Sequence, residues 1–548
     1  MEFKKNYGSI ARVLFWLALF LPTLLALAQS GGNGRTWQTI LWAASACLIP
    51  SLLPATLFVV VQWLFLLLIP VLLWWITYAA LNGIGPGIEA AIAALSATSS
   101  EAWGAILITI NAPAALFFSV VCSACLVSSI VMMRKARHSK PSSDSAPTHL
   151  KLLLFFAILP FSISFVSNAS GLPVPVLFLA SDPGYSPLGT ATRLIWEGFD
   201  EVLYGDIKVI APERRTATAP RIEHNARLAV FIIGESVRAG GIGPEQINRG
   251  AWTKALDVRV QNHLGAWLPT TCSGSNGTAV SVPMLLTGLT PQRYAESGTA
   301  PSILAILKVA GYKTAWISNQ DKNVFTEHGH DYYWTITHSG SVSDSYDEQL
   351  VPIAKTFITP LLLQNDRATT PYAMALHLHG SHFDYAQRYP ATDFDAEPKG
   401  LSNDALTELR YNRSEEYTAK VINELLRLLD ATKAPAFLVY SSDHGENLPS
   451  DHNGVLFHLG PRATLKDGTT TSFVMWNQAM AMTGEPTKVL SQIMTMPMIA
   501  HADVAKIYLS LAGMYDGAVA PDRDPEILAP VELGGGDLQP HPCSMLKP

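Results

Sequence analysis

The distribution of uncharged apolar segments in the first third of this chain is what most constrains its fold. Residues 13–28 contain no charged side chain, and neither does the longer segment 37–81. Because a helix needs ~20 apolar residues to cross a bilayer, the longer segment has room for two helices, which we expect to turn near 50–54. Two further apolar segments, 105–133 and 152–166, bring the expected number of membrane spans to five.

Lysine and arginine near the ends of these segments predict the orientation of the chain in the membrane. Basic residues precede the first span and crowd the segment before the fifth, whereas the loop 82–103 has none. Because basic flanks stay on the cytoplasmic side, we expect the N-terminus inside, and five spans then place everything after about residue 168 outside. In a bacterium with two membranes, that compartment is the periplasm. The first span lacks the cleavage pattern of a removable signal peptide.

The rest of the chain divides into a linker and a larger soluble domain. Residues 169–226 are rich in Pro, Gly, Ser and Thr, and they contain one expected amphipathic helix over 191–204. That helix either lies on the membrane surface or packs on the soluble domain. We therefore expect three parts: a transmembrane domain of five helices at 1–168, a periplasmic linker at 169–226 and a periplasmic domain at 227–548.

Charge and cysteine content exclude some classes of protein. The formal net charge of -6 at pH 7 and the lack of a basic cluster in the soluble part argue against a nucleic-acid partner. Of the five cysteines, only Cys272 and Cys543 fall outside the expected spans. In an oxidising compartment these two can form a disulfide, but the sequence alone leaves their pairing open.

Short β-rich apolar segments alternate with helical ones from residue 227 onward, which predicts a doubly wound, mainly parallel α/β sheet. The expected elements are strands at 227–234, 312–318, 372–380 and 436–443, and helices at 414–432 and 504–513. Ligands of such sheets bind beyond the carboxyl ends of the strands. Three of the expected strands lead into polar residues at that edge: Glu235, His382, and the pair Asp443 and His444.

A segment rich in Ser, Thr and Gly, SGSNGTAVSVPMLLTG at 273–288, supplies candidate nucleophiles. A segment of this composition is often only a loop or a helix cap. A helix that begins just after Thr278 would aim its first N–H groups at a bound phosphate, which favours Thr278. Five other hydroxyls compete with it: Thr270, Thr271, Ser273, Ser275 and Ser281.

Glu235, Asp443 and His444 are candidate metal ligands. Because Glu235 follows a glycine at a strand end, it could equally cap a helix. Asp443 and His444 belong to the sequence DHGE, which occurs by chance in many proteins but here follows an apolar strand. Zinc accepts such oxygen and nitrogen ligands in tetrahedral geometry, and a divalent cation lowers the cost of deprotonating a hydroxyl nucleophile.

Three segments in this order resemble the membrane-bound phosphoethanolamine transferases that modify bacterial lipopolysaccharide, within the alkaline phosphatase and sulfatase superfamily. These segments are FIIGES at 231–236, SGSNGTAVSVPMLLTG at 273–288 and SSDHGEN at 441–447. The resemblance implies an alkaline phosphatase-like catalytic domain in which Thr278 is both the nucleophile and a metal ligand. It also implies that Glu235, Asp443 and His444 complete the ligands of Zn²⁺, with one or two ions in the site.

The same resemblance points to further site residues. His382 stands in HGSHFDYAQRYP and His458 in NGVLFHLG, and in relatives these positions contact the phosphoryl group or a second zinc ion. We expect either histidine to protonate the leaving group or to activate the acceptor hydroxyl, and Glu446 of DHGE to orient a ligand. The expected substrate-binding residues are Asn319 and Lys322 in SNQDKN, and Thr98 and Glu101 in ATSSEAW.

The activity that the resemblance implies is transfer of phosphoethanolamine from phosphatidylethanolamine, through a phosphothreonine intermediate, to lipid A, a core sugar of lipopolysaccharide or another periplasmic glycan. The enzyme would be a multi-pass protein of the bacterial inner membrane. Many lipid A transferases bracket the nucleophile with paired cysteines, whereas this chain has Met284 after VSVP, and Cys272 has no near partner in the sequence. It therefore looks more like the cysteine-poor relatives that act on core sugars or other periplasmic acceptors.

Two alternative functions share parts of this pattern. A phosphoglycerol transferase or phosphodiesterase of the same superfamily would use the same metal and nucleophile, but the sequence TAVSVP speaks against it. A membrane transport or scaffold protein with an inactive domain is a rival from another class. The expected spans contain almost no ionisable residue and the metal ligands are all present, which argues against that rival.

Overall fold

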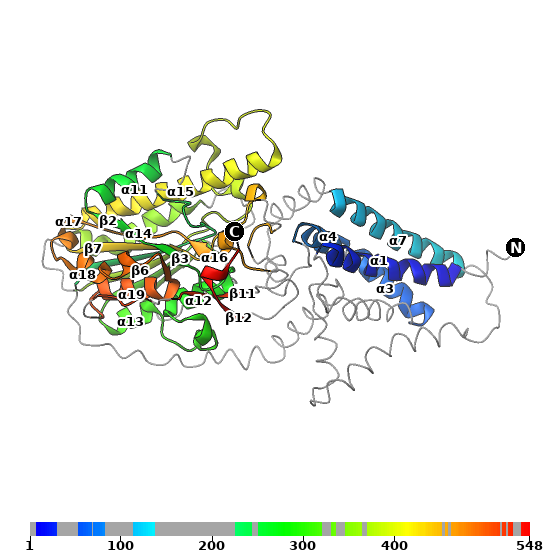
Figure 1. Cartoon of the computed structure of the whole chain (residues 1–548), viewed down its shortest axis with the longest axis horizontal. Helices are drawn as coiled ribbons and strands as arrows, with labels where there is room; N and C mark the ends of the chain where they lie inside the picture. The colour runs from blue at the N-terminus through cyan, green and yellow to red at the C-terminus, as the bar shows by residue number, and fades with distance from the viewer. Residues whose placement is uncertain are drawn as a thin grey trace. The chain divides into compact units, whose positions relative to one another are not determined.

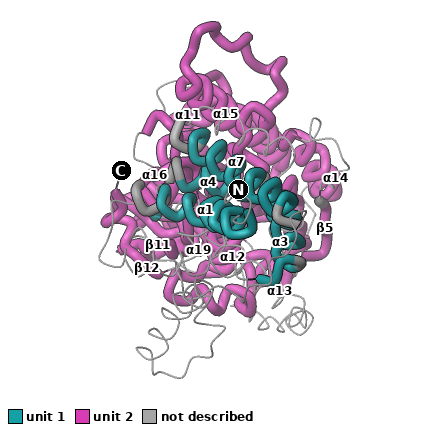
Figure 2. Tube along the Cα trace, turned by 90° about the vertical axis from the view of Figure 1, so that its right-hand side faces the viewer, with its two compact units in different colours: residues 1–206, 459–462, 532–537 teal, residues 207–458, 463–531, 538–548 magenta. Residues whose placement is uncertain are grey.

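The structure, a computed structural model, describes residues 7–29, 53–67, 69–82, 113–137, 225–243, 250–320, 330–335, 346–363, 370–451, 455–458, 462–515, 518–521, 524–529 and 539–547. The chain forms two compact units, coloured separately in Figure 2: residues 1–206, 459–462 and 532–537, and residues 207–458, 463–531 and 538–548. The first holds the apolar N-terminal helices and the second holds the α/β domain. The expected linker lies outside the described residues, apart from its last two.

Apolar helices make up the described part of the first unit: α1 (Tyr7–Gln29), α3 (Ala55–Leu67), α4 (Ile69–Asn82) and α7 (Pro113–Arg137). Phe15 of α1, Phe58 of α3 and Leu126 of α7 are buried in one shared apolar cluster, so these helices pack on one another. Among the described helices, two are long and apolar enough to cross a membrane, over Tyr7–Leu25 and Leu116–Lys135.

The expectation of five membrane spans is therefore not confirmed. α1 and α7 coincide with the first and fourth expected spans, but the second helix expected within 37–81 is instead the pair α3 and α4, of 13 and 14 residues. Pro70 falls in the first turn of α4, where a proline is tolerated because an N–H there has no partner within the helix. The fifth expected span, 152–166, lies outside the described residues, so the number five stays a prediction.

The α/β domain is built on a seven-stranded sheet with the order β2, β9, β7, β1, β6, β4, β5. Its strands are β1 (Leu228–Gly234), β2 (Gly265–Trp267), β4 (Lys313–Ser318), β5 (Tyr332–Thr335), β6 (Tyr372–His377), β7 (Ala436–Ser442) and β9 (Ser472–Trp476). The strands from β7 to β5 run parallel, and β9 is antiparallel to both of its neighbours. The expected doubly wound, mainly parallel sheet is confirmed, with all four predicted strands present.

Successive side chains of β1 point into two different cores on opposite faces of this sheet. Val230 and Ile232 belong to one core, and Phe231 and Ile233 belong to the other. The helices of the first core are α11 (Ala251–Gln261), α14 (Leu350–Leu363) and α15 (Asn403–Ala431). Those of the second are α12 (Thr278–Thr287), α13 (Ile303–Val309), α17 (Gln478–Ala481), α18 (Glu485–Leu490) and α19 (His501–Leu511) (Figure 1). Because both faces are covered, the central strands are apolar throughout their length.

Smaller elements complete the domain. A second sheet places β3 (Thr270–Cys272) between β10 (Met498–Ala500) and β8 (Thr469–Thr470), and β11 (Glu526–Ala529) pairs with β12 (Gln539–Pro542). The short helices are α16 (Leu465–Gly468) and 3-10 turns at Pro291–Glu296, Asp347–Gln349, Tyr385–Gln387, Ala391–Asp393, Pro449–Asp451, Ile493–Thr495 and Cys543–Met545. Cys272 forms a disulfide with Cys543, with 6.0 Å between their Cα atoms. This bond answers the question of pairing that the sequence leaves open.

The predicted helices are present, but one begins much earlier than predicted. α15 starts at Asn403 rather than at 414, because the Ser402 side chain caps it by accepting a hydrogen bond from the Ala405 N–H. The first two turns of α15 contain no fully buried side chain before Tyr411, so they lie outside the buried stripe that predicts the rest of the helix. A cap thus extends this helix beyond its buried stripe.

Candidate active site

Two of the predicted metal ligands lie side by side because the strands before them are neighbours. β1 and β7 pair in parallel, and Gly234 is opposite Ser442 in their register. Glu235 and Asp443 therefore leave the sheet together at its carboxyl edge, and both are buried. Backbone N–H groups fix this junction, since Asp443 donates to the Gly234 carbonyl at 3.1 Å and Ser236 donates to Asp443 Oδ1 at 3.1 Å.

Thr278 reaches the same edge as the first residue of α12. Gly277 precedes the helix in an extended conformation, and the Ser281 hydroxyl, one turn into the helix, donates to the Asp443 carbonyl at 2.8 Å. Thr278 Oγ1 lies 3.3 Å from Glu235 Oε2 and 3.2 Å from His444 Nε2. The hydroxyl that the sequence favours as nucleophile is thus in contact with the side chains of two predicted ligands.

Four contacts among the predicted ligands have the spacing of neighbouring zinc ligands, with Thr278 next to Oε2 of Glu235 and His444 next to Oε1. His444 Nε2 lies 3.4 Å from Glu235 Oε1 and 3.3 Å from Asp443 Oδ2, which matches the Thr278 contacts. Two ligands at about 2.0–2.1 Å from Zn²⁺ in a tetrahedron are about 3.3–3.4 Å apart. Asp443 Oδ2 is buried without a hydrogen-bond partner, as expected of an oxygen that faces a cation. We name these four residues the inner cluster.

A second grouping of possible ligands extends from the inner cluster. Glu235, His444 and His458 have ligand atoms that all lie within 4.8 Å of one another. This grouping and the inner cluster share Glu235 and His444 and differ in their other members. The His458 ring lies 4.2 Å from the His444 ring and 5.6 Å from the His382 ring, centroid to centroid. His382 and His458, which we name the outer pair, therefore stand next to the inner cluster.

Hydrogen bonds at Nδ1 orient two histidine rings of the site. His444 Nδ1 donates to the Gly445 carbonyl at 2.8 Å, and His382 Nδ1 donates to the Phe383 carbonyl at 2.7 Å. Because carbonyl oxygens only accept, Nδ1 carries a proton in both rings, and in the neutral His444 ring Nε2 carries the lone pair. His458 Nδ1 lies 3.0 Å from Glu446 Oε2, which agrees with the expected orienting role of Glu446.

Burial shifts the pKa values of the inner cluster in different directions. Burial and the neighbouring Asp443 raise the pKa of Glu235 well above its ordinary value. Burial acts in the same sense on Asp443, but His444 and the Thr278 hydroxyl outweigh it and lower the pKa of that carboxyl. Burial also lowers the pKa of His444, which keeps the imidazole neutral. A neutral imidazole beside two buried carboxyl groups is a setting that a divalent cation stabilises.

The predicted substrate-binding residues are described only in part. Lys322, Thr98 and Glu101 lie outside the described residues. Asn319 is buried, and its amide donates to Asp347 Oδ1 at 2.6 Å. The Asp347 carboxylate also accepts the N–H groups of residues 379 and 380. Asn319 therefore contributes to holding the turn that leads to His382.

Gln320 contacts Glu235, and the sequence did not predict this contact. Its Nε2 donates to Glu235 Oε2 at 3.0 Å and to the Leu378 carbonyl at 2.9 Å, so it fixes the orientation of a predicted metal ligand. Its position in SNQDKN, next to Asn319, was the available signal. Position 380 requires a glycine, because its φ is positive and an added Cβ would lie 2.8 Å from the Glu235 nitrogen.

A doubly wound sheet with a hydroxyl among carboxyl and imidazole groups at its carboxyl edge defines an alkaline phosphatase-like domain. The chain belongs to the sulfatase family, whose profile matches residues 227–514. The named relatives are more specific. Phosphoethanolamine transferase EptC of Escherichia coli K12 is 32% identical over 165 residues, which are 27% of each chain. Phosphoethanolamine transferase EptA of the same strain is 26% identical over 260 residues, or 45% of each chain.

One solved structure matches nearly the whole chain. The integral membrane protein lipooligosaccharide phosphoethanolamine transferase A of Neisseria meningitidis has a TM-score of 0.63 and 16% identity, over 92% of this chain and 96% of its own. At this identity the match shows a shared fold. The sequence alignments span only about a quarter to a half of the relatives' length. The resemblance to phosphoethanolamine transferases is thereby confirmed, whereas the activity of this chain is a proposal.

Proposed function

We propose that this protein transfers phosphoethanolamine from phosphatidylethanolamine to a lipopolysaccharide acceptor, with Thr278 as the nucleophile. The observation that carries the proposal is the contact of Thr278 Oγ1 with Glu235 at 3.3 Å and with His444 at 3.2 Å. A hydroxyl held by potential bases and metal ligands is suited to form a covalent intermediate. The relatives' names indicate that the transferred group is phosphoethanolamine.

Glu235, Thr278, Asp443 and His444 would hold one Zn²⁺, and the outer pair would contribute to a second. Bound zinc would lower the cost of deprotonating a coordinated hydroxyl and neutralise charge on the phosphoryl oxygens. Gln320 holds the Glu235 carboxylate through its 3.0 Å hydrogen bond, and Ser281 ties α12 to the end of β7. The protein thus presents the nucleophile and the ligands together, before any substrate arrives.

The transfer would proceed in two displacements at phosphorus. Thr278 Oγ1 forms a bond to phosphorus as the bond to the glycerol oxygen breaks, and diacylglycerol leaves with a proton while phosphothreonine remains. An acceptor hydroxyl then attacks the same phosphorus, gives up its proton and releases Thr278. His382 and His458, which stand next to the inner cluster, would carry these protons. The N–H groups at the start of α12 would face the phosphoryl oxygens.

The membrane setting fits a lipid donor. We place the transmembrane domain at 1–168 in the bacterial inner membrane, the linker at 169–226 and the catalytic domain at 227–548 in the periplasm, where the Cys272–Cys543 disulfide is stable. Lys322, Thr98 and Glu101 are proposed to contact the donor, whereas the bond from Asn319 to Asp347 supports an indirect contribution. The acceptor is lipid A, a core sugar or another periplasmic glycan.

A phosphoglycerol transferase or phosphodiesterase of the same superfamily could use the same inner cluster. Mass spectrometry separates these activities when lipid A, core oligosaccharide and periplasmic glucans are compared from cells with wild-type protein, Thr278→Ala protein or neither. We expect a phosphoethanolamine increment that requires wild-type protein, and its carrier identifies the acceptor. A phosphoglycerol increment would support the alternative, and an unchanged phosphoethanolamine increment with Thr278→Ala would exclude Thr278 as the nucleophile.

A further inference from the structure

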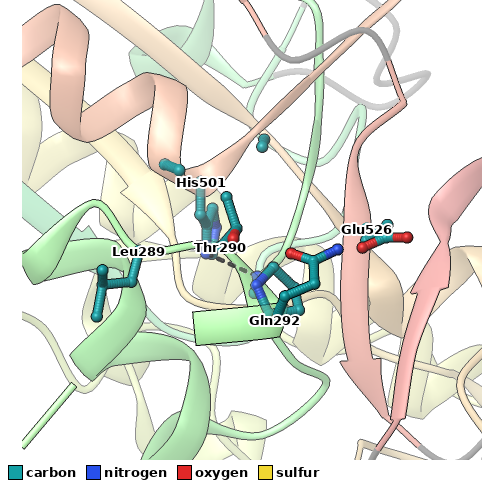
Figure 3. Close-up of a pocket in the computed structure, with 9 residues that line it drawn as sticks. Leu289, Thr290, Gln292, His501 and Glu526 are labelled. Atoms are coloured by element: carbon teal, nitrogen blue, oxygen red, sulfur yellow. Dashed lines mark hydrogen bonds between the residues drawn. The ribbon is translucent and has the colours of Figure 1, made fainter. Parts of the chain in front are cut away.

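His501 is a buried histidine outside the inner cluster, and both of its ring nitrogens are bonded. It is the first residue of α19 and is 1% exposed. The Gly274 N–H donates to His501 Nδ1 at 3.0 Å, and His501 Nε2 lies 3.0 Å from the Ser442 carbonyl. Figure 3 shows the ring beside Thr290 in a small pocket that Gln292 and Glu526 also line.

These two bonds require one state of the imidazole. Nδ1 accepts from an N–H and therefore carries no proton, whereas Nε2 faces a carbonyl and must donate. Burial lowers the pKa of His501 to about 4, so the ring is neutral at neutral pH, as this pair of bonds demands. The ring is a rigid link with an acceptor at one corner and a donor at the other.

The two bonded backbone groups belong to the segments that carry the inner cluster. Gly274 lies in the loop between β3 and Thr278, and Ser442 is the last residue of β7, directly before Asp443. The Ser442 hydroxyl in turn accepts from the Val237 N–H at 2.8 Å, two residues after Glu235. His501 therefore joins the nucleophile loop to the strand ends that bear the carboxyl ligands.

We propose that His501 is a positioning residue, which fixes the distance between Thr278 and the metal ligands while contacting neither substrate nor metal. The proposal rests on the proposed function for its rate measurements but not for its metal-retention measurement. Removing an outer hydrogen bond of this kind typically changes metal affinity or rate about 10- to 100-fold. Because the ring makes two bonds to two segments, its two contributions are separable.

Three substitutions separate the contributions of the two His501 hydrogen bonds in the full-length, detergent-purified protein. His501→Asn places an oxygen near the position of Nδ1 and keeps the Gly274 bond, whereas His501→Gln places an amide near Nε2 and keeps the Ser442 bond. His501→Phe fills the volume without either bond. His377→Gln is the matched control, since His377 is also fully buried but neither ring nitrogen has a hydrogen-bond partner. Thermal unfolding of each variant reports any general loss of stability.

Zinc retention and rate are measured separately. Loss of zinc to a chromogenic chelator should be about tenfold faster in His501→Asn and near wild type in His501→Gln. Phosphoethanolamine transfer at saturating zinc should be about tenfold slower in His501→Gln and closer to wild type in His501→Asn. His501→Phe should show both defects, and His377→Gln neither.

The proposal would be overturned if the three His501 variants did not differ from one another in zinc retention or in transfer rate. It would also be overturned if the losses of zinc and of transfer rate in His501→Asn and His501→Gln simply followed the decrease in their unfolding temperatures. A wild-type protein that retains zinc but transfers no phosphoethanolamine would contradict the proposed function instead. In that case the zinc-retention comparison still decides whether His501 positions the ligands.

Discussion

The inner cluster and the outer pair are built on different kinds of structure. Glu235, Asp443 and His444 follow two paired strands and Thr278 begins a helix, with side-chain contacts of 3.2–3.4 Å between them. The outer pair stands on loops, and its two rings are 5.6 Å apart. Groups that hold an ion need a fixed geometry, whereas groups that exchange protons with a substrate need space beside it. The carboxyl edge of the sheet supplies the fixed geometry, and its loops supply the space.

The largest expected effect tests the nucleophile of the inner cluster. Thr278→Ala should lower the transfer rate on the order of 10³-fold or more, because it removes the hydroxyl that contacts both Glu235 and His444. Thr278→Ser keeps the hydroxyl and should retain a measurable rate. The check is turnover of a fluorescent phosphatidylethanolamine, and equal rates for the Ala and Ser variants would contradict the assignment.

The next effect concerns the metal ligands. Asp443→Asn should lower both the zinc content and the transfer rate by about 100-fold, because it removes the negative charge beside His444. Chelation of wild-type protein should abolish transfer, and added Zn²⁺ should restore it. Asp430→Asn is the matched control, since Asp430 pairs with Arg259 at the surface. Full zinc content in Asp443→Asn, measured by elemental analysis, would contradict the assignment of Asp443 as a metal ligand.

The outer pair should give a similar loss of transfer rate but no loss of the first ion. His382→Ala and His458→Ala should each slow transfer by about 100-fold, the usual contribution of a general acid or base, while the ion of the inner cluster is retained. The measurement pairs turnover with zinc content for each variant. Loss of the first ion as complete as in Asp443→Asn would show that the distinction between inner cluster and outer pair is wrong.

The last prediction concerns the stability of the fold rather than the activity of the site, and it depends on pH. Burial raises the pKa of Glu415 from its ordinary value of 4.5 to about 7. A raised pKa contributes stability that is full below about pH 4.5 and lost as the pH rises through about 7. Relative to Glu415→Gln, wild-type protein should therefore lose on the order of 3 kcal/mol between pH 4.5 and 8. Thermal unfolding at several pH values checks this, and a constant difference would contradict it.

Residues at strand ends were predictable from the sequence, whereas contacts between distant segments were not. Short apolar strands ending in Glu235 and in Asp443-His444 locate the inner cluster, because parallel strands bring their carboxyl ends to one edge. The bond from Gln320 to Glu235 and the Cys272–Cys543 disulfide join segments 85 and 271 residues apart. No local pattern specifies such pairs. The resemblance to phosphoethanolamine transferases, rather than periodicity, located the outer pair.

The bounds of the helices were also only partly predictable from the sequence. The apolar stripe of α15 predicted its buried part, but the less buried part that begins after Ser402 depends on a cap that periodicity does not register. In the first unit, apolar composition located α1 and α7 but did not predict that residues 55–67 and 69–82 form two short helices. Hydropathy reports burial or lipid contact, and it contains little information on where a helix breaks.

The covalent state of Thr278 is the most direct test of the central claim. Purified wild-type protein is incubated with zinc and phosphatidylethanolamine without an acceptor, then quenched in acid, digested and analysed by mass spectrometry. We predict the added mass of one phosphoethanolamine group on the peptide that contains Thr278, and no such mass in Thr278→Ala. Modification of another residue, or transfer to an added acceptor while Thr278 is never modified, would contradict the account.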